Sequence, residues 1–295
     1  AMSIWRGVQE AKARMVELRP VLIAGFGGYP SLPALAAAGK RPVLIHEQNS
    51  VLGRVNKMFA GRAAIVACGF DRLDGLPRKY LKRKRVTGNP VRPPIRALRN
   101  IPYPPIHPGG DIQLLITGGS QGARILGDVV PAACARLPDD LRMRLKVVQQ
   151  TRQEQIEAVQ GVYAKAGITA ECAPFFSDMA DRLAASHFFV GRAGASTLTE
   201  LTCVGRPALF VPLGIAMDDH QTANAAGMVA AGAADALGER DFTPDKVAAL
   251  LTQRLNDPAG LSARARSAHA LGKPDAADAL AAIAEQLVDS NEVKS

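Results

Sequence analysis

Small and hydroxyl-bearing residues follow an apolar run in the stretch GRAGAST, residues 191–197, and the helix-like stretch LTELTCVG comes next. Small side chains at such a turn let a ligand approach the backbone, and the first turn of a helix offers N–H groups to an anion. Glu200 lies one turn further on, where a carboxylate can accept hydrogen bonds from two hydroxyl groups, as in a ribose. This pattern predicts a nucleotide-diphosphate site. The alternative is a capping box with Ser196 as N-cap and Thr199 or Glu200 beside it.

A second glycine-rich turn, TGGSQGAR at 117–124, follows the apolar residues LLI and opens another predicted helix. The same reasoning favours contact with a phosphate or a sugar. Tight turns between strands and helices also use glycine for packing alone, so this alternative stays open. The turn at 191–197 is not a P-loop, because no Gly-Lys-Ser/Thr follows it.

Two further polar clusters also follow apolar runs. DDHQTAN (218–224) supplies carboxylates and amides that suit sugar hydroxyls, although an acid-rich helix start has a similar composition. HEQNS (46–50) places His46 beside Glu47, a pair that can perform acid–base chemistry or serve a purely structural role. The spacing of these acids and histidines matches no metal signature, so we expect no metal site.

The elements around these four stretches follow one rhythm. Continuous apolar runs of strand length alternate with helical patterns, which predicts parallel sheets covered by helices on both faces. In doubly wound sheets ligands bind beyond the carboxyl ends of the strands, and each of the four stretches follows a predicted strand. We therefore predict an α/β protein with two Rossmann-like domains.

Proline marks the predicted domain boundary. Residues 93–110, PPIRALRNIPYPPIHPGG, are too rich in proline for a regular element and are typical of a linker. The expected organisation is an N-terminal domain at 1–92, a linker at 93–110, a C-terminal domain at 111–272 and a helical segment at 273–295.

Composition narrows the class of protein. The 295 residues include 36 Lys and Arg against 27 Asp and Glu, and the net charge of +9 favours an anionic partner or simply solubility. The four cysteines stand far apart without a C-x-x-C pair, which indicates reduced thiols in a cytosolic protein. Nucleic acid is not an expected partner, because no stacking aromatic residues accompany the basic ones.

The N-terminal stretch has the pattern of an amphipathic helix. Apolar residues Ile4, Trp5, Val8 and Met15 recur at helical spacing, and arginines and lysines flank them. A basic amphipathic helix is typical of a membrane surface, so these four residues are our predicted membrane contacts. The alternative is an ordinary helix that packs on the sheet.

Six stretches together resemble those of one family: GFGGYPSLPA, HEQNSVLGRVNK, GNPVR, GGSQGAR, RAGASTLTE and DDHQTAN. The family is MurG, the UDP-N-acetylglucosamine transferases of bacterial peptidoglycan synthesis, and the resemblance runs from about Trp5 to the C-terminal helix. It implies a GT-B fold, in which two Rossmann-like domains face a cleft and the last helix crosses back to the first domain. It also implies an incomplete first domain, because nothing here matches the family's N-terminal GGTGGH loop.

The resemblance implies roles for individual residues. Ser120 and the backbone of residues 195–197 would hold the diphosphate, Phe176 would read uracil through its backbone, and Glu200 would bind the ribose. His220 and Gln221 would contact the hydroxyls of N-acetylglucosamine (GlcNAc). The predicted substrate-binding residues are Asn49, Arg92, Ser120, Phe176, Ala195, Ser196, Thr197, Leu198, Thr199, Glu200, His220 and Gln221. The missing loop holds the histidine proposed as the family's base, so the base here is unassigned, with His46, Glu47 and His220 as candidates.

The resemblance implies an inverting transfer of GlcNAc from UDP-GlcNAc to the C4 hydroxyl of the MurNAc unit of lipid I, which gives lipid II. A base takes the hydroxyl proton and helix N-termini stabilise the UDP leaving group, so no metal or other cofactor is expected. The expected partners are UDP-GlcNAc, lipid I, an anionic membrane surface and other proteins of cell-wall synthesis or division. The expected location is the cytoplasmic face of the bacterial membrane, as a peripheral protein.

Two alternatives stay open at this point. The first is a truncated, catalytically impaired homologue that binds a nucleotide sugar. The second is another GT-B glycosyltransferase with a different acceptor, which GFGGYPSLPA and HEQN disfavour because they lie in the acceptor half.

Overall fold

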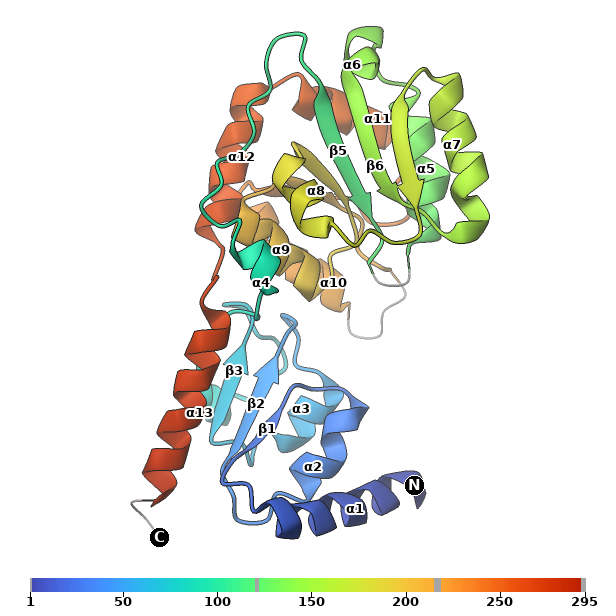
Figure 1. Ribbon diagram of the computed structural model, residues 1–295. Helices are drawn as coiled ribbons and strands as arrows, with labels where there is room; N and C mark the ends of the chain where they lie inside the picture. Colours follow the sequence, from blue (N-terminus) through green and yellow to red (C-terminus); the bar gives the residue numbers. More distant parts are fainter. Residues whose placement is uncertain (1, 120–121, 215–218, 293–295) are drawn as a thin grey trace. The chain divides into compact units, whose positions relative to one another are not determined.

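The computed structural model divides the chain into two compact units, residues 1–90 with 273–295 and residues 91–272 (Figure 1). The structure describes residues 2–119, 122–214 and 219–292. Each unit is built on one parallel sheet, which confirms the predicted α/β class. No helix among these residues is long and apolar enough to cross a membrane.

The first unit is a four-stranded sheet in the order β1-β2-β3-β4 with helices on both faces. Its elements are α1 (Met2–Leu18), β1 (Ile23–Gly25), η1 (Tyr29–Ser31), α2 (Leu32–Ala36), β2 (Val43–Glu47), α3 (Arg54–Phe59), β3 (Ile65–Cys68), η2 (Arg78–Arg83), β4 (Lys84–Val86) and α13 (Ala276–Glu292).

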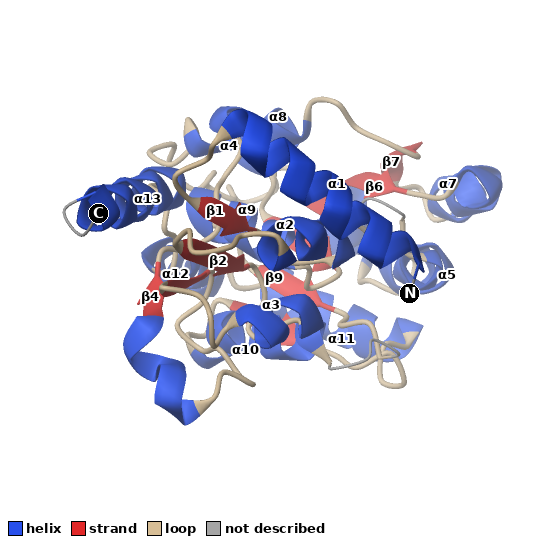
Figure 2. Cartoon of the chain, turned by 90° about the horizontal axis from the view of Figure 1, so that it is seen from below, coloured by secondary structure: helices blue, strands red, loops and turns tan. Residues whose placement is uncertain are grey.

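Alternation along β2 explains the two layers of this unit. Val43 and Ile45 point to a cluster that α1, α2 and α3 cover, and Leu44 points to the opposite face, where Leu280 of α13 packs. Figure 2 shows α13 on one side of these strands and α2 with α3 on the other. The sheet is therefore buried on both faces, as the continuous apolar run VLI predicts.

The second unit is a six-stranded parallel sheet in the order β10-β9-β8-β5-β6-β7. Its elements are α4 (Pro93–Arg96), β5 (Ile112–Thr117), α5 (Arg124–Cys134), α6 (Asp139–Arg144), β6 (Leu145–Gln150), η3 (Gln153–Gln155), α7 (Ile156–Lys165), β7 (Thr169–Ala173), α8 (Met179–Ala185), β8 (Phe188–Gly191), α9 (Ala195–Val204), β9 (Ala208–Phe210), α10 (His220–Ala230), β10 (Ala234–Ala236), α11 (Pro244–Leu255) and α12 (Pro258–Ala270).

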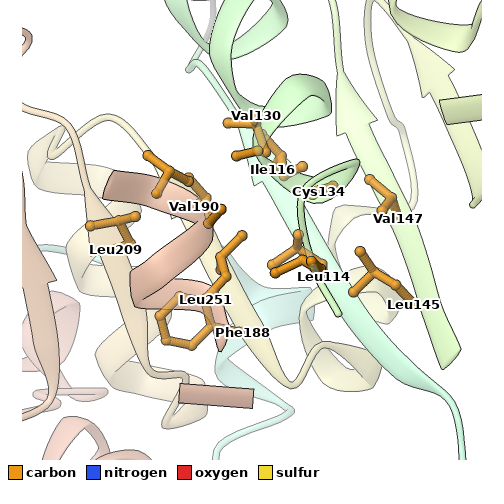
Figure 3. Close-up of a cluster of buried hydrophobic side chains, with 14 of the residues drawn as sticks. Leu114, Ile116, Val130, Cys134, Leu145, Val147, Phe188, Val190, Leu209 and Leu251 are labelled. Carbon is orange, nitrogen blue, oxygen red and sulfur yellow. The ribbon is translucent and has the colours of Figure 1, made fainter. Parts of the chain in front are cut away.

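The core of the second unit lies between the central strands and helices α5, α7 and α11. Leu114, Ile116, Val190 and Leu251 are among the fully buried side chains that fill it (Figure 3). Each such side chain contributes about 1.5–3 kcal/mol when it leaves water. The order changes direction between β5 and β8, and in this fold ligands bind beyond the strand ends near that point.

The prediction of an irregular linker at 93–110 is wrong in its first part. Pro93 and Pro94 occupy the first turn of α4, where the missing N–H of proline costs no hydrogen bond. Ile95 is buried, and the whole segment belongs to the second unit. Residues 273–295 group with the first unit, where α13 packs.

The membrane prediction for α1 needs correction at two of its four residues. Met15 is 7% exposed, and Val8 packs against the same core cluster, because positions 8, 11 and 15 form the stripe that faces this cluster. Trp5 is 68% exposed and Ile4 is 44% exposed. Trp5 lies 100° around the helix from Ile4, which turns it toward Val16, 75% exposed.

Candidate active site

The start of α9 has three backbone N–H groups available for a ligand. Gly194 is the N-cap, with extended backbone angles and no side-chain cap. Leu198 N is the first amide of the helix to bond backward, to Gly194 O at 3.0 Å. The N–H groups of residues 195–197 therefore have no acceptor within the helix. The capping-box alternative with Ser196 as N-cap is wrong, because the N-cap of α9 is Gly194 and Ser196 already lies inside the helix.

Glu200 lies in the second turn of α9 and is held by an arginine. Arg92 Nε donates to Glu200 Oε1 at 2.8 Å, and the side chains are 63% and 16% exposed respectively. This hydrogen bond raises the pKa of Arg92. Arg92 is the residue before α4, and α4 packs on α9, so the local fold brings the two residues together.

Two of the predicted residues in α9 are engaged within the unit. The side chain of Leu198 is 1% exposed and belongs to the core. Thr199 Oγ1 donates to Ala195 O at 2.8 Å along the helix. Ser196 is exposed and Thr197 half-buried, so their hydroxyls are the ones that the first turn presents outward.

The glycine-rich turn after β5 is tightly built. A Cβ at Gly118 would stand 2.2 Å from Ala123 N, so only glycine fits there. Ser120 lies outside the described residues. After β7, Phe176 is buried beneath the guanidinium of Arg182, whose Cζ lies 4.1 Å from the ring centroid. Only the backbone of Phe176 can therefore face a ligand, as the predicted uracil contact requires.

The start of α10 carries His220 and Gln221. His220 is the first residue of the helix, and its N-cap Asp219 has left-handed backbone angles. Gln221 Oε1 accepts a hydrogen bond from Leu213 N at 3.0 Å, which fixes the side chain against the loop after β9. The other end of the side-chain amide is an –NH₂ group with two N–H donors.

The HEQN stretch at the end of β2 forms a buried polar network. Glu47, 4% exposed, accepts hydrogen bonds from Asn49 N (3.1 Å), Gly53 N (2.9 Å) and Asn56 Nδ2 (2.8 Å). These bonds use both carboxylate oxygens and hold the loop 48–53 in place. Glu47 is thus well placed to shape this loop.

His46 is also buried, at 1% exposed, and its Nε2 lies 3.0 Å from Gly88 O. The ring of Phe26 lies 5.7 Å from the His46 ring, between centroids. Burial lowers the pKa of His46, outweighing the hydrogen bond to Gly88 and the nearby Glu47. His46 is therefore a neutral imidazole at neutral pH.

Two parts of the chain match models of known domains. Residues 113–280 match the glycosyltransferase family 28 C-terminal domain, and residues 1–68 match the glycosyltransferase family 28 N-terminal domain. The chain belongs to glycosyltransferase family 28.

Two relatives with about half of their residues identical carry the same name. The UDP-N-acetylglucosamine–N-acetylmuramyl-(pentapeptide) pyrophosphoryl-undecaprenol N-acetylglucosamine transferase of Maricaulis maris is 52% identical over 98% of this chain and 79% of its own length. The protein of the same name in Rhodospirillum centenum is 50% identical over 95% of this chain and 75% of its own length. The resemblance to MurG is confirmed.

Solved structures confirm the GT-B-like fold. The crystal structure of Acinetobacter baumannii MurG matches with a TM-score of 0.81 and 33% identity, over 97% of this chain and 80% of that one. A putative UDP-N-acetylglucosamine 2-epimerase from Listeria monocytogenes matches with a TM-score of 0.69 and 16% identity, over 95% and 78%. The second likeness concerns the fold alone.

Each unit holds a polar residue that the sequence analysis did not single out. Arg192, directly after β8, pairs with Glu239 at 2.6 Å and donates to Val211 O at 3.0 Å, so it joins the loops after three neighbouring strands. Asn56 completes the Glu47 network from α3. Arg192 was visible as a lone cation in GRAGAST, whereas nothing in the sequence links Asn56 to Glu47.

Proposed function

We propose that this chain transfers GlcNAc from UDP-GlcNAc to the C4 hydroxyl of the MurNAc unit of lipid I, which makes lipid II. The observation that carries the proposal is the start of α9. Three amides without helical acceptors lie one turn from a carboxylate that Arg92 orients. An anion at the amides and a diol at the carboxylate are the two features of a nucleoside diphosphate sugar.

The proposed donor site explains how the bond to UDP breaks. Negative charge develops on the β-phosphate as the sugar leaves, and the helix N-terminus of α9 stabilises that charge. His220 and Gln221 at the start of α10 would bind the sugar hydroxyls, and Phe176 would bind uracil through its backbone. Ser120 remains a proposed phosphate contact. The side chains of Leu198 and Thr199 are turned inward, so only their positions in the helix would matter.

The first unit supplies the proposed acceptor side. Asn49 donates through Nδ2 to Glu47 Oε1 at 3.3 Å, which orders the loop in which Asn49 would contact the acceptor. Glu47 and His46 hold the loop and the strand end. We leave the base unassigned between these residues and His220.

Peripheral attachment to an anionic membrane is part of the proposal. Trp5 and Val16 are exposed along the outer side of α1. Four segments that precede strands of the first unit (18–22, 37–42, 60–64 and 76–83) contain no acid, whereas the earlier part of the connection from β3 to β4 carries Asp71 and Asp74. The four segments contain the cations Arg19, Lys40, Arg41, Arg62, Arg78, Lys79, Lys82 and Arg83. Cations beside exposed apolar side chains suit an anionic lipid surface.

A transfer assay tests the reaction. The chain would be incubated with labelled UDP-GlcNAc and lipid I in detergent, and label in the lipid fraction would be measured. Lipid II formation that disappears in Glu200→Gln supports the proposal. Binding of UDP-GlcNAc without any transfer would instead support the alternative, a nucleotide-sugar-binding homologue that lacks the base.

A further inference from the structure

Gln150 joins the two turns on which the proposed donor site depends. It is the last residue of β6, which lies between β5 and β7 in the sheet. Its Oε1 accepts a hydrogen bond from Gly118 N at 3.2 Å, in the glycine-rich turn after β5. Its Nε2 donates to Pro174 O at 3.2 Å, in the loop after β7.

Both backbone partners of Gln150 lie close in sequence to predicted ligand contacts. Gly118 lies two residues before Ser120, and Pro174 lies two residues before Phe176. The first turn would hold phosphate and the second would read the base. One amide side chain therefore sets the distance between them, because its oxygen and its nitrogen are fixed on one rigid plane.

The surroundings make this bridge stiff. The backbone of Gly118 packs closely against Ala123, because a Cβ at position 118 would stand 2.2 Å from Ala123 N. The residue after β6 adds a second constraint, because Thr151 N donates to Ala173 O of β7 at 2.9 Å. A movement of the loop at 174–176 is thus transmitted to the glycine-rich turn through Gln150.

We propose that Gln150 is a positioning residue that couples base recognition to diphosphate recognition. This role rests on the proposed function, because it assumes a nucleotide at the donor site. Gln150 itself touches no substrate in this account. It pre-orders two loops, and such pre-ordering raises affinity by lowering the cost of binding.

The experiment compares UDP with uridine as calorimetric ligands of the full chain and of three variants. Gln150→Ala removes both hydrogen bonds. Gln150→Glu keeps an acceptor for Gly118 but loses the donor to Pro174 and adds a negative charge. Gln155→Ala is the control, because Gln155 Nε2 also makes two hydrogen bonds, to Asp128 Oδ1 (2.7 Å) and Arg124 O (3.3 Å), but both partners lie in the one helix α5.

The bridge predicts a split between the two ligands. Gln150→Ala should lower the affinity for UDP about tenfold, which corresponds to the loss of one or two hydrogen bonds. The affinity for uridine should fall by no more than about threefold, because uridine would contact only the loop after β7. Gln150→Glu should weaken UDP further, because its charge repels the diphosphate. Gln155→Ala should leave both affinities within about twofold.

Three results would contradict the role. One is a Gln150→Ala variant whose UDP affinity stays within about twofold of the unaltered chain. Another is an equal loss for UDP and uridine together with a lower unfolding temperature, which indicates general damage. The third is an unaltered chain that binds no UDP, which would contradict the proposed function as well as this role. If it binds UDP and Gln150→Ala changes nothing, only this role falls.

Discussion

Arg92 Nε donates to Glu200 Oε1 at 2.8 Å and thereby joins residues 108 positions apart in the chain. The pair belongs to one unit, so α4 and α9 alone determine it. Glu200 is the less exposed partner, and the arginine orients it without burying it. Because Arg92 bonds to one oxygen of this carboxylate, the second oxygen is the one that we propose for the ribose hydroxyls.

Arg92→Met tests whether this orientation matters. We expect UDP-GlcNAc affinity to fall about threefold to tenfold, because Glu200 then spends part of its time in other rotamers. Glu200→Gln should cost more, about tenfold to a hundredfold, since it loses charged hydrogen bonds to the sugar. Both are measured by calorimetry. Tighter binding in Arg92→Met would contradict the account, because it would mean that the arginine competes with the ribose.

Glu47→Gln tests the network of the first unit. The amide would turn an N–H toward one of the backbone donors that Glu47 now accepts, at Asn49 or Gly53. We expect about 2 kcal/mol lower unfolding free energy for this unit. Lipid I use should fall while calorimetric UDP-GlcNAc affinity stays unchanged, because the donor site lies in the other unit. A parallel loss of donor affinity would show that Glu47 has a different role.

His46 predicts a pH dependence of stability. Burial lowers the pKa of the folded-state His46 below its ordinary value of 6.5. As the pH falls through 6.5, the unfolded chain takes up a proton that the folded chain refuses, so stability is lost on the acid side. The unfolding temperature should fall between pH 7.5 and about 5.5, and His46→Gln should reduce that change. His187, whose pKa burial also lowers, keeps part of the dependence in the variant. An unchanged slope in His46→Gln would contradict the assignment.

Membrane attachment through α1 predicts a contrast between neighbouring residues. Trp5→Ser with Val16→Ser should lower co-sedimentation with phosphatidylglycerol vesicles while the unfolding temperature stays within a few degrees. Val8→Ser should instead lower the unfolding temperature, because Val8 packs on the core. Vesicles of phosphatidylcholine are the control. Equal vesicle binding by the double variant and the unaltered chain would contradict a membrane contact through α1.

Much of the fold could be predicted from the sequence, because apolar strands and the polar residues that follow them are local patterns. VLIHE and HFFVG each predicted a buried strand followed by site residues, and both strands are present. The errors at α1 and α4 also have local causes. A stripe of apolar residues looks alike whether it faces a sheet or a lipid, and Pro93 and Pro94 suit a first helical turn as well as a linker.

The contacts that shape the site could not be read in the same way. Arg92 and Glu200 lie too far apart in sequence for any spacing rule, and so do Glu47 and its donor Asn56 on α3. These pairs depend on how helices pack on a sheet, and that depends on many side chains at once. The motifs indicated which residues matter, and the packing decides which of them support a loop and which are available to a ligand.

The most direct measurement is calorimetric titration of the full chain with UDP-GlcNAc, with UDP-glucose as the control ligand. The account predicts selective binding of UDP-GlcNAc that Glu200→Gln weakens and Glu47→Gln leaves unchanged. Absence of binding, or equal affinity for both sugars, would contradict the assignment of the α9 and α10 helix starts as a UDP-GlcNAc site.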